Sequence, residues 1–341
     1  SANDMRIKLI NPTQLDESGQ PIKFNKELAA GLTLPYVAAL IPGRHDITIV
    51  EESIETIDFE EPVDLVGLTA MTCRAPRAYW IAKQYRQRGV PVVMGGFHAT
   101  ALPEEALQHC DAVVKGEAED VIAQVMEDAL AGKIGGIYER SEPHNMKNLP
   151  IPRYDLMNIK NYFIPVYPVQ VTRGCPYSCD FCSVTALFGS VHRKRPVDDV
   201  IRDMEAAGPL LTIVDDNLTY DRQYALDLFR AIKPLRKNWI GQVNLNSAAD
   251  EELMRAAADS GCRAVYLGVE TLNKESLRNA NKIPNINCSI KDALMQLKRQ
   301  HIEAFVSMIV GFEDDTLETA EQIKNFCDRM RVPILFLYIL T

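Results

Sequence analysis

Short runs of continuously apolar residues alternate with helix-like segments along almost the whole chain, in two series. The first series has its apolar runs at residues 6–10, 46–50, 64–70, 92–94 and 112–114. The helix-like segments between and after them are residues 34–40, 75–88, 103–109 and 117–130. Runs that are apolar throughout are typical of parallel strands covered on both faces. We therefore predict an α/β domain with a doubly wound parallel sheet over residues 5–138, whose ligands bind at the carboxyl ends of the strands.

The second series begins near residue 169 and has six apolar runs. They are residues 169–172, 211–214, 240–245, 264–269, 304–310 and 334–340. Six parallel strands joined by helices predict a partial (β/α)₆ barrel over residues 169–341, with its chemistry at the carboxyl ends of the strands. Residues 139–168 contain five prolines and are predicted to be a linker between the two domains. Residues 1–4, before Met5, are interpreted as the remnant of a tag.

Cys175, Cys179 and Cys182 lie on a loop that follows the first strand of the second series. Three thiols this close together are a poor pattern for a hydrophobic core, but they can converge on one metal centre. Closed iron–sulfur clusters and structural zinc sites generally take four protein ligands, so three cysteines on a 4Fe–4S cluster would leave one iron open. The alternatives are incidental packing and a non-enzymatic zinc-binding module, for which His192 would be the nearest fourth ligand.

The overall charge and composition exclude some classes of partner. A net charge of −9 argues against broad binding to nucleic acid, which needs a basic surface. No apolar run is long enough to span a bilayer, and no signal peptide is visible, so no membrane span is expected. Apart from the loop, the cysteines are scattered singly, which suits a reducing compartment. We expect a cytoplasmic protein.

Small or polar residues end three neighbouring strands of the first series. Thr69, Ala70 and Met71 end the third strand, Gly95 and Gly96 end the fourth, and Gly116 and Glu117 follow the fifth. A glycine pair at a strand end lets a flat or bulky ligand approach the backbone closely. Neither a Gly-x-Gly-x-x-Gly dinucleotide fingerprint nor a P-loop is present. The pattern indicates a ligand at this edge without identifying it.

The Cys-x₃-Cys-x₂-Cys spacing is identical to the signature of the radical S-adenosylmethionine (SAM) enzymes, and the chain resembles that superfamily. The resemblance implies that the three cysteines hold a 4Fe–4S cluster whose open iron binds SAM. The strand-end groups of the first domain resemble those of cobalamin-binding domains, and residues 97–105 and 116–119 resemble the cobalamin-dependent radical SAM class. Other motifs look most similar to the branch that contains hopanoid methylases. The fold implied is a Rossmann-like cobalamin-binding domain followed by a radical SAM barrel.

This resemblance assigns expected contacts to both small molecules. Those to cobalamin are Thr69, Ala70, Met71, Gly95, Gly96, Gly116 and Glu117. Those to SAM are Phe181, Asp216, Gln242, Glu270, Ile309 and Gly311. After the fifth barrel strand, either Asp314 stands in place of the usual Glu or Glu313 is that Glu, shifted by one position. Gln242, Asn244 and Asn246 alternate along the third barrel strand and are expected to face one side of it.

Cobalamin domains with a histidine below the cobalt carry an Asp-x-His-x-x-Gly motif, which is absent after the first strand here. We therefore expect cobalamin, as methylcobalamin, to bind without a protein histidine ligand. His98 and Cys73 lie near the same strand ends, where packing or surface roles are expected for them.

The activity implied by the resemblance is reductive cleavage of SAM to a 5′-deoxyadenosyl radical, followed by methylation of an unactivated carbon via methylcobalamin. The alternatives are a cobalamin-dependent cyclase or rearrangement enzyme and a methylthiotransferase, whose first domain carries three cluster cysteines where this chain has Cys73 and Cys110. The expected partners are a small-molecule or lipid substrate and an electron donor such as flavodoxin or ferredoxin. The resemblance also suggests that the natural protein continues past Thr341, so that the barrel is truncated after its sixth strand.

Overall fold

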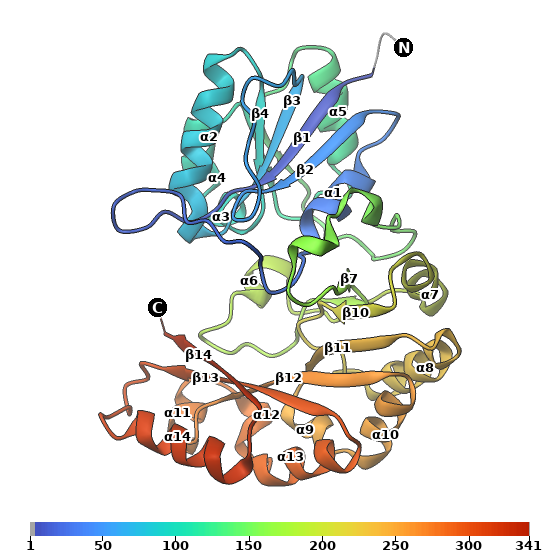
Figure 1. Ribbon diagram of the computed structural model, residues 1–341, viewed down its shortest axis with the longest axis vertical. Coiled ribbons are helices and arrows are strands. Elements are labelled where there is room, and N and C mark those ends of the chain that lie inside the picture. The colour runs from blue at the N-terminus through green and yellow to red at the C-terminus, as the bar shows by residue number, and fades with distance from the viewer. Residues whose placement is uncertain (1–3, 341) are drawn as a thin grey trace. The chain divides into compact units, whose positions relative to one another are not determined.

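The structure is a computed structural model that describes residues 4–340 of the chain. The chain folds as two compact units that divide between Val166 and Tyr167. Each unit is built on one six-stranded sheet, coloured blue to green in the first unit and green to red in the second (Figure 1). The expected tag residues 1–3 and the final residue 341 lie outside the described part.

The sheet of the first unit has the order β2-β1-β3-β4-β5-β6, and all its strands pair in parallel. The strands are β1 (Arg6–Asn11), β2 (Asp46–Glu51), β3 (Leu65–Thr69), β4 (Val92–Gly95), β5 (Ala112–Lys115) and β6 (Gly136–Glu139). The strand order reverses at β1 and β3, so the carboxyl ends of these two strands flank the switch point where ligands of such sheets bind. The predicted doubly wound sheet is confirmed.

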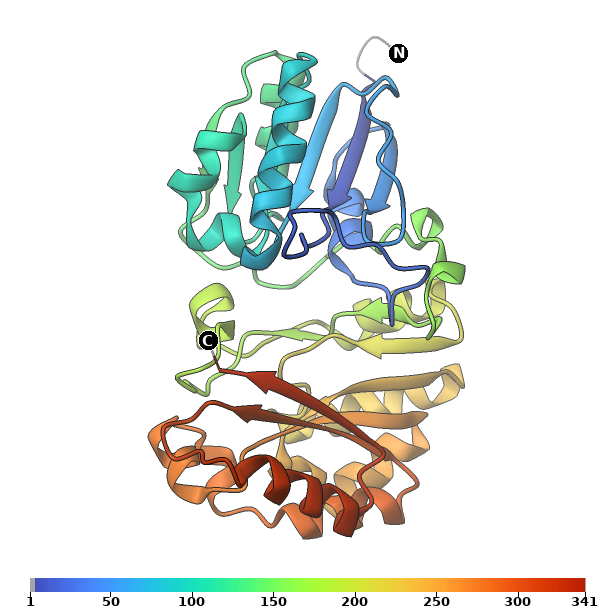
Figure 2. The same ribbon diagram turned by 60° about the vertical axis from the view of Figure 1, so that its left-hand side comes forward.

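Helices cover both faces of this sheet, as its apolar strands require (Figures 1 and 2). On one face lie α2 (Ala75–Gln87), α3 (Phe97–Ala101) and α4 (Pro103–His109), whose buried residues pack on Val66, Leu68, Val92 and Met94. On the other face lie α1 (Thr33–Leu40) and α5 (Ile122–Leu130), which pack on Ile7, Leu9, Val93 and Val114. The first core therefore consists of two layers separated by the sheet.

Three details of the first unit differ from the sequence-based expectation. Strand β6 was not predicted, because its residues are mostly exposed and form no apolar run. Helix α5 begins at Ile122 rather than at residue 117. Most of the expected linker is folded with the first unit: it contains short helical turns at Tyr154–Leu156 and Ile159–Asn161, and Tyr162 forms a parallel bridge with Glu27.

The sheet of the second unit is also parallel throughout, in the order β14-β13-β12-β11-β10-β7. Its strands are β7 (Tyr167–Val169), β10 (Leu210–Ile213), β11 (Asn238–Val243), β12 (Cys262–Glu270), β13 (Glu303–Val310) and β14 (Ile334–Ile339). All six predicted strands are present, within a few residues. The short strands β8 (Thr172–Arg173) and β9 (Arg193–Lys194) pair antiparallel beside this sheet.

The connections of the second unit are mainly helical. The helices are α6 (Val184–Phe188), α7 (Val197–Ala206), α8 (Arg222–Ile232), α9 (Leu245–Ala248), α10 (Glu251–Asp259), α11 (Lys274–Asn279), α12 (Ile283–Ile286), α13 (Ile290–Arg299) and α14 (Thr319–Met330). In Figures 1 and 2, α9, α10, α13 and α14 lie together on one face of the sheet. Within residues 4–340 the longest helix, α2, has 13 residues, and no helix is long and apolar enough to cross a membrane.

The expected row of amides on the third barrel strand is wrong. Strand β11 ends at Val243, so Gln242 is on the strand, whereas Asn244 and Asn246 are not. Asn244 is instead the N-cap of α9, where its side chain accepts a hydrogen bond from the backbone N–H of Ser247 at 2.8 Å. Asparagine is a favoured N-cap residue, and this local role ends the strand earlier than the alternation suggested.

Glu51, the last residue of β2, is expected to make the stability of the chain depend on pH. Burial raises the pKa of Glu51 to about 7, and the charge of Glu27 adds to the rise, although the Asn11 amide donates a hydrogen bond that opposes it. The folded state thus keeps a proton that the unfolded state has lost, so stability falls as pH rises from the unfolded pKa to about 7. We expect Glu51→Gln to remove this loss, of at most about 3 kcal/mol.

The measurement is urea unfolding of wild type and Glu51→Gln at several pH values. The variant should match wild type at pH values below the unfolded pKa and exceed it in stability above the folded pKa. The exposed Glu17→Gln is the matched control and should follow wild type throughout. A constant difference between Glu51→Gln and wild type at all pH values would contradict the prediction.

Candidate functional site

The three cysteines lie on the loop between β8 and α6, on the carboxyl side of strand β7. Cys179 is buried, Cys175 is partly buried and Cys182 is exposed. The backbone N–H of Cys182 donates to the carbonyl of Cys179 at 3.0 Å, which makes a tight turn between them. Gly174 precedes the loop with φ at 86°, and an added Cβ would lie 2.4 Å from the carbonyl oxygen of Val191. The entry to the loop therefore requires glycine.

The loop is fastened to a segment about a hundred residues further along the chain. The backbone N–H of Asp180 donates to the carbonyl of Ala280 at 3.1 Å. The Asn281 side chain donates to the carbonyl of Ser178 at 3.2 Å. At the other end, the Thr185 hydroxyl donates to a loop carbonyl at 3.0 Å. These bonds fix the backbone that carries the thiols without using the thiols themselves.

The thiols are free and do not converge on a single point. In the part of the chain that the structure describes, no three His, Cys, Asp or Glu side chains are placed to hold one metal ion. In an iron–sulfur cubane each cysteine binds a different iron, so a cluster does not need such convergence. His192, the possible fourth zinc ligand, is also not placed to share a metal ion with the three cysteines. Its ring Nε2 lies 3.0 Å from the carbonyl oxygen of Asn217.

Lys282 is a residue of this site that sequence reasoning missed. Its ammonium pairs with the carboxylate of Glu270 at 3.0 Å and lies 5.7 Å from the ring centroid of Phe181. Burial alone would lower the pKa of Lys282, but the negative charges of Glu270 and Cys179 raise it above its usual value. Burial also raises the pKa of the Cys179 thiol, and Lys282 opposes that rise. The Lys282 ammonium thus lies beside two predicted SAM contacts, Glu270 and Phe181, and close enough to the cysteine loop to affect the pKa of Cys179.

Removing this cation should destabilise the second unit. The side chains of Lys282 and Glu270 are 20% and 9% exposed, so Lys282→Met would leave a mostly buried carboxylate without its partner. We expect a loss of roughly 3 kcal/mol in the free energy of unfolding. The double variant Lys282→Met/Glu270→Gln should regain part of it, because no unpaired charge remains.

Urea unfolding of the single and double variants tests this prediction. Lys324→Met is the matched control, because Lys324 pairs with Asp328 in an exposed position where ion pairs contribute little. Equal losses from Lys282→Met and Lys324→Met would contradict the prediction.

The two adjacent acids after β10 have different roles. Asp215 is buried and accepts hydrogen bonds at 2.7 Å from the backbone N–H groups of Val171 and Thr172. Burial raises the pKa of Asp215 to about 7, although these hydrogen bonds favour its charged form. Asp216, the predicted SAM contact, is only partly buried, and its carbonyl accepts from the Gln242 side chain at 2.9 Å. Asp215 therefore holds the backbone, which leaves Asp216 available for a ligand.

The predicted contacts to the adenine of SAM form a small apolar group. Phe181 packs against a buried cluster of three residues, Ala280, Ile309 and Phe312. The rings of Phe181 and Phe312 meet edge to face, with 6.2 Å between their centroids. Ile309 belongs to β13, so the cysteine loop and the end of β13 meet here.

Gly311 follows β13, and an acid four residues further along the chain holds its backbone N–H. The carboxylate of Asp315 accepts hydrogen bonds from the backbone N–H groups of Gly311 at 2.7 Å and Phe312 at 3.0 Å. The side chain of Asp314 instead accepts from the Ser276 hydroxyl at 3.1 Å. Asp315, two residues beyond Glu313, is the acid that shapes the turn.

In the first unit, the predicted cobalamin contacts lie at the carboxyl ends of β3, β4 and β5. Gly96 has φ at 90°, and an added Cβ would lie 2.5 Å from Oγ1 of Thr69 and 3.2 Å from the backbone nitrogen of Ala70. The ends of β3 and β4 therefore meet at a distance that only glycine allows. Met71, the next residue of the β3 loop, is exposed at the same edge.

Thr100, on α3, joins two of the predicted groups and was missed from the sequence. Its hydroxyl donates to the carbonyl of Gly96 at 2.8 Å and accepts from the backbone N–H of Gly116 at 3.0 Å. The neighbouring carboxylate of Glu117 accepts from the backbone N–H of His144 at 2.8 Å. The predicted residues of the first unit therefore form one connected edge of the sheet.

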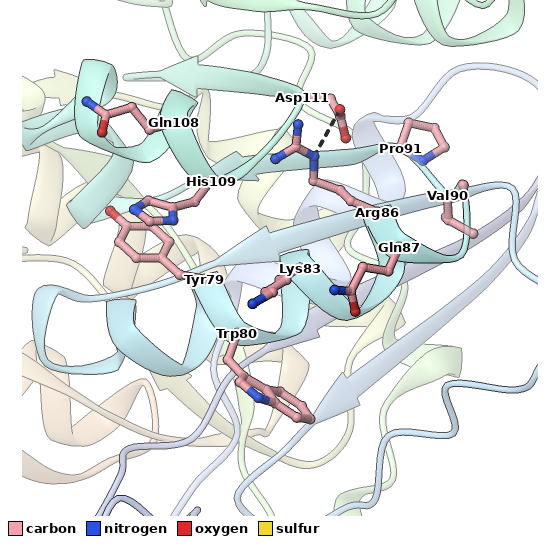
Figure 3. A pocket seen from close by; sticks show the side chains of 11 residues that line it. Tyr79, Trp80, Lys83, Arg86, Gln87, Val90, Pro91, Gln108, His109 and Asp111 are labelled. Carbon is pink, nitrogen blue, oxygen red and sulfur yellow. Dashed lines mark hydrogen bonds and ion pairs between the residues drawn. The ribbon is translucent and has the colours of Figure 1, made fainter.

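A surface pocket on the first unit lies away from these residues. It is formed by α2, α4 and the segment between α2 and β4, and Figure 3 shows its lining side chains. Tyr79 and His109 stack there with 3.8 Å between ring centroids, and Arg86 pairs with Asp111 at 3.2 Å. None of the predicted site residues lines this pocket.

Comparison with known proteins matches two family models to the two units. Residues 31–126 match the B12 binding domain, and residues 169–327 match the radical SAM superfamily. Among solved structures, the radical SAM methyltransferase TsrM from Kitasatospora setae, with cobalamin and a 4Fe–4S cluster bound, superposes with a TM-score of 0.76. The match covers 98% of this chain and 72% of TsrM at 15% identity, so it shows a shared fold.

Curated relatives are similar over most of the chain. An uncharacterized methyltransferase of Pyrococcus horikoshii is 31% identical, with 88% of this chain and 73% of the relative covered. The bacteriochlorophyllide d C-12(1)-methyltransferase of Chlorobaculum tepidum is 29% identical, with 91% and 71% covered. The hopanoid C-2 methylase of Rhodopseudomonas palustris is 25% identical, with 89% and 60% covered. The chain therefore belongs to the radical SAM enzymes that carry a B12-binding domain and that include these methyltransferases.

Proposed function

We propose that this chain is a cobalamin-dependent C-methyltransferase that acts on an unactivated carbon of a small-molecule or lipid substrate. The observation that carries the proposal is the presence, in one chain, of a three-cysteine loop on a radical SAM fold and a glycine-lined edge on a B12-binding fold. The relatives support methyl transfer, because all three described above are named methyltransferases or methylases.

The donor set of the cysteine loop fits a 4Fe–4S cluster. Its three donors are all free thiols, and soft sulfur ligands select iron–sulfur clusters over hard cations. Cys175, Cys179 and Cys182 would each bind one iron, and Gly174 fixes the backbone that presents them. SAM would take the remaining position.

The edge of the first unit fits a bulky ligand such as cobalamin. The close approach at Gly96 leaves no room for a side chain, whereas an added Cβ at Gly116 would have no atom within 4 Å. Gly116 has φ at 80°, which disfavours any other residue there. Thr69, Ala70, Met71, Gly95 and Glu117 complete this edge in the proposal. Both nitrogens of the nearby His98 ring face hydroxyl groups, which supports cobalamin binding without a histidine ligand.

When bound, the cluster supplies the electron that cleaves SAM, and cobalamin supplies the methyl group. The side chains of the second unit bind and orient SAM. Phe181 and Ile309 offer an apolar surface for the adenine, with Gly311 at its edge. Asp216 and Gln242 offer polar groups for the amino acid part, and Glu270, held by Lys282, offers a carboxylate for the ribose.

The reaction also needs an electron donor, for which we propose a small redox protein of the flavodoxin or ferredoxin kind. We further propose a cytoplasmic location. The support for it is that all eight cysteines of the chain are free, which suits a reducing compartment.

The test is anaerobic reconstitution of the chain with iron, sulfide and cobalamin, followed by reaction with SAM and a reductant. We expect an EPR signal of a reduced 4Fe–4S cluster, a cobalamin absorption spectrum after desalting, and both 5′-deoxyadenosine and S-adenosylhomocysteine by mass spectrometry. With SAM deuterated in the methyl group, bacteriochlorophyllide d and a hopanoid serve as the first substrates to examine for label.

The products separate the proposal from its alternatives. Formation of 5′-deoxyadenosine without S-adenosylhomocysteine would favour a cyclase or rearrangement enzyme. A chain that takes up zinc but assembles no iron–sulfur cluster would favour a zinc-binding module. Label in a thiomethyl group would favour a methylthiotransferase.

A further inference from the structure

His98 is a buried histidine directly behind the glycine edge of the first unit. It is the second residue of α3, two residues after Gly96, and it is 2% exposed. Its backbone N–H donates to the carbonyl of Ala70 at 3.0 Å, which already ties α3 to the loop after β3. The proposed function gives His98 no contact to a cofactor, and a buried imidazole needs partners for both of its nitrogens.

The His98 ring bridges two hydroxyl groups from different parts of the unit. Nε2 lies 2.6 Å from the hydroxyl oxygen of Tyr79, and Nδ1 lies 3.3 Å from Oγ1 of Thr72. Tyr79 donates its single hydroxyl proton to Glu105 at 2.9 Å, so it accepts a hydrogen bond from His98. A proton on Nε2 therefore faces Tyr79 and also the Glu105 carboxylate, 3.3 Å away, and in the neutral ring Nδ1 accepts from the Thr72 hydroxyl.

Tyr79 is itself held from the outside of the unit. Its ring stacks on His109, with 3.8 Å between centroids, and Figure 3 shows the two rings facing each other beside the surface pocket. Glu105, on α4, fixes the Tyr79 hydroxyl. Helices α2 and α4 thus provide a rigid support on the Nε2 side of His98.

The other side of His98 faces the loop after β3, which enters a short 3₁₀ helix at Thr72–Arg74 and is held further along by the Gln14 amide, which donates to Cys73 Sγ at 2.9 Å. Met71, Thr72 and Cys73 are all exposed, and they follow the last residue of β3. Gly96 packs against Thr69 and Ala70, at the start of this loop. The His98 ring contacts the Thr72 hydroxyl, in the middle of the loop. We infer that His98 is a positioning residue, which fixes the loop of residues 69–73 in the form that receives cobalamin. This inference rests on the proposed function.

Two substitutions separate the sides of the ring. In Asn the side-chain oxygen occupies nearly the place of imidazole Nδ1, whereas in Gln the amide reaches the place of Nε2. His98→Asn should therefore keep the bond to Thr72, and His98→Gln should keep the bond to Tyr79 and lose Thr72. We expect His98→Gln to raise the cobalamin Kd about tenfold, the effect of one lost hydrogen bond, and His98→Asn to leave it close to wild type.

A second measurement examines the loop without cobalamin. Hydrogen exchange of the cobalamin-free chain should show faster exchange at Arg74, whose backbone N–H donates to the carbonyl of Met71 at 2.9 Å, in His98→Gln but not in His98→Asn. His109→Asn is the matched control, because this exposed histidine touches Tyr79 but not the loop. Melting temperatures of all variants show whether the fold is retained.

The outcomes are distinguishable from those of the proposed function. A wild-type chain that never takes up cobalamin contradicts the proposed function, and the exchange measurement then decides on His98 by itself. Equal exchange and equal affinity in the Asn and Gln variants overturn the inference. A fall in melting temperature that is the same in both variants, with cobalamin affinity unchanged, assigns His98 a structural role only.

Discussion

Alanine at Cys175, Cys179 or Cys182 is expected to abolish cluster assembly and SAM cleavage. Each thiol would bind a different iron, so no neighbouring thiol replaces a missing one. Gly174 fixes the entry to the cysteine loop, so the loop cannot shift to offer another donor. After anaerobic reconstitution, each variant should lack the EPR signal of the reduced cluster, and 5′-deoxyadenosine should fall to the level of a reaction without protein.

The control for this experiment is a cysteine elsewhere in the same unit. Cys327 is a partly buried free thiol on α14, and Cys327→Ala should keep the full iron content and the full rate of SAM cleavage. Circular dichroism should be the same for all four variants, because the loop is held mainly by backbone and side-chain bonds that do not involve sulfur, and the one bond to Cys175 Sγ, from the Asn217 amide, is long at 3.7 Å. A variant of Cys175 that retains cluster and activity would contradict the assignment.

The fold was predictable where burial leaves a clear mark on the sequence. Most strands of both sheets are short, buried apolar runs, because parallel strands covered by helices have no polar face to interrupt them. Strand β14 has an apolar run although its residues are mostly exposed. Strand β6 lies at the edge of the first sheet and is mostly exposed, so its sequence shows no such run. The amide row failed for a different reason, because Asn244 caps a helix locally where alternation alone suggested a continued strand.

The candidate site also has a part that the sequence predicts and a part that only the fold reveals. The cysteines are close in sequence, so their spacing alone indicates a shared centre. Lys282 reaches Glu270 and Phe181 only because the segment after β12 folds back onto the cysteine loop. Thr100 and Asp315 act through backbone groups of the glycines they hold. Such roles depend on three-dimensional proximity, which no local pattern in one sequence records.

Valine or alanine at Gly96 is expected to prevent cobalamin binding while the rest of the chain stays folded. The added Cβ would clash with Thr69, and the positive φ costs a non-glycine residue about 1–3 kcal/mol. Both effects push the ends of β3 and β4 apart, at the edge proposed to receive the ligand. The measurement is the cobalamin absorption that remains after desalting of the reconstituted chain.

Gly132→Ala separates the clash from the backbone strain. Gly132 also has a positive φ, of 65°, but an added Cβ there would have no atom within 4 Å. This variant should lose some stability and retain cobalamin as wild type does. The double variant Thr69→Ala/Gly96→Ala removes the oxygen nearest to the new Cβ, so it should bind more cobalamin than Gly96→Ala alone. Because Thr69 is itself a proposed contact, Thr69→Ala is the reference for that comparison. Retention of cobalamin by Gly96→Val at the wild-type level would show that the ligand does not depend on this edge.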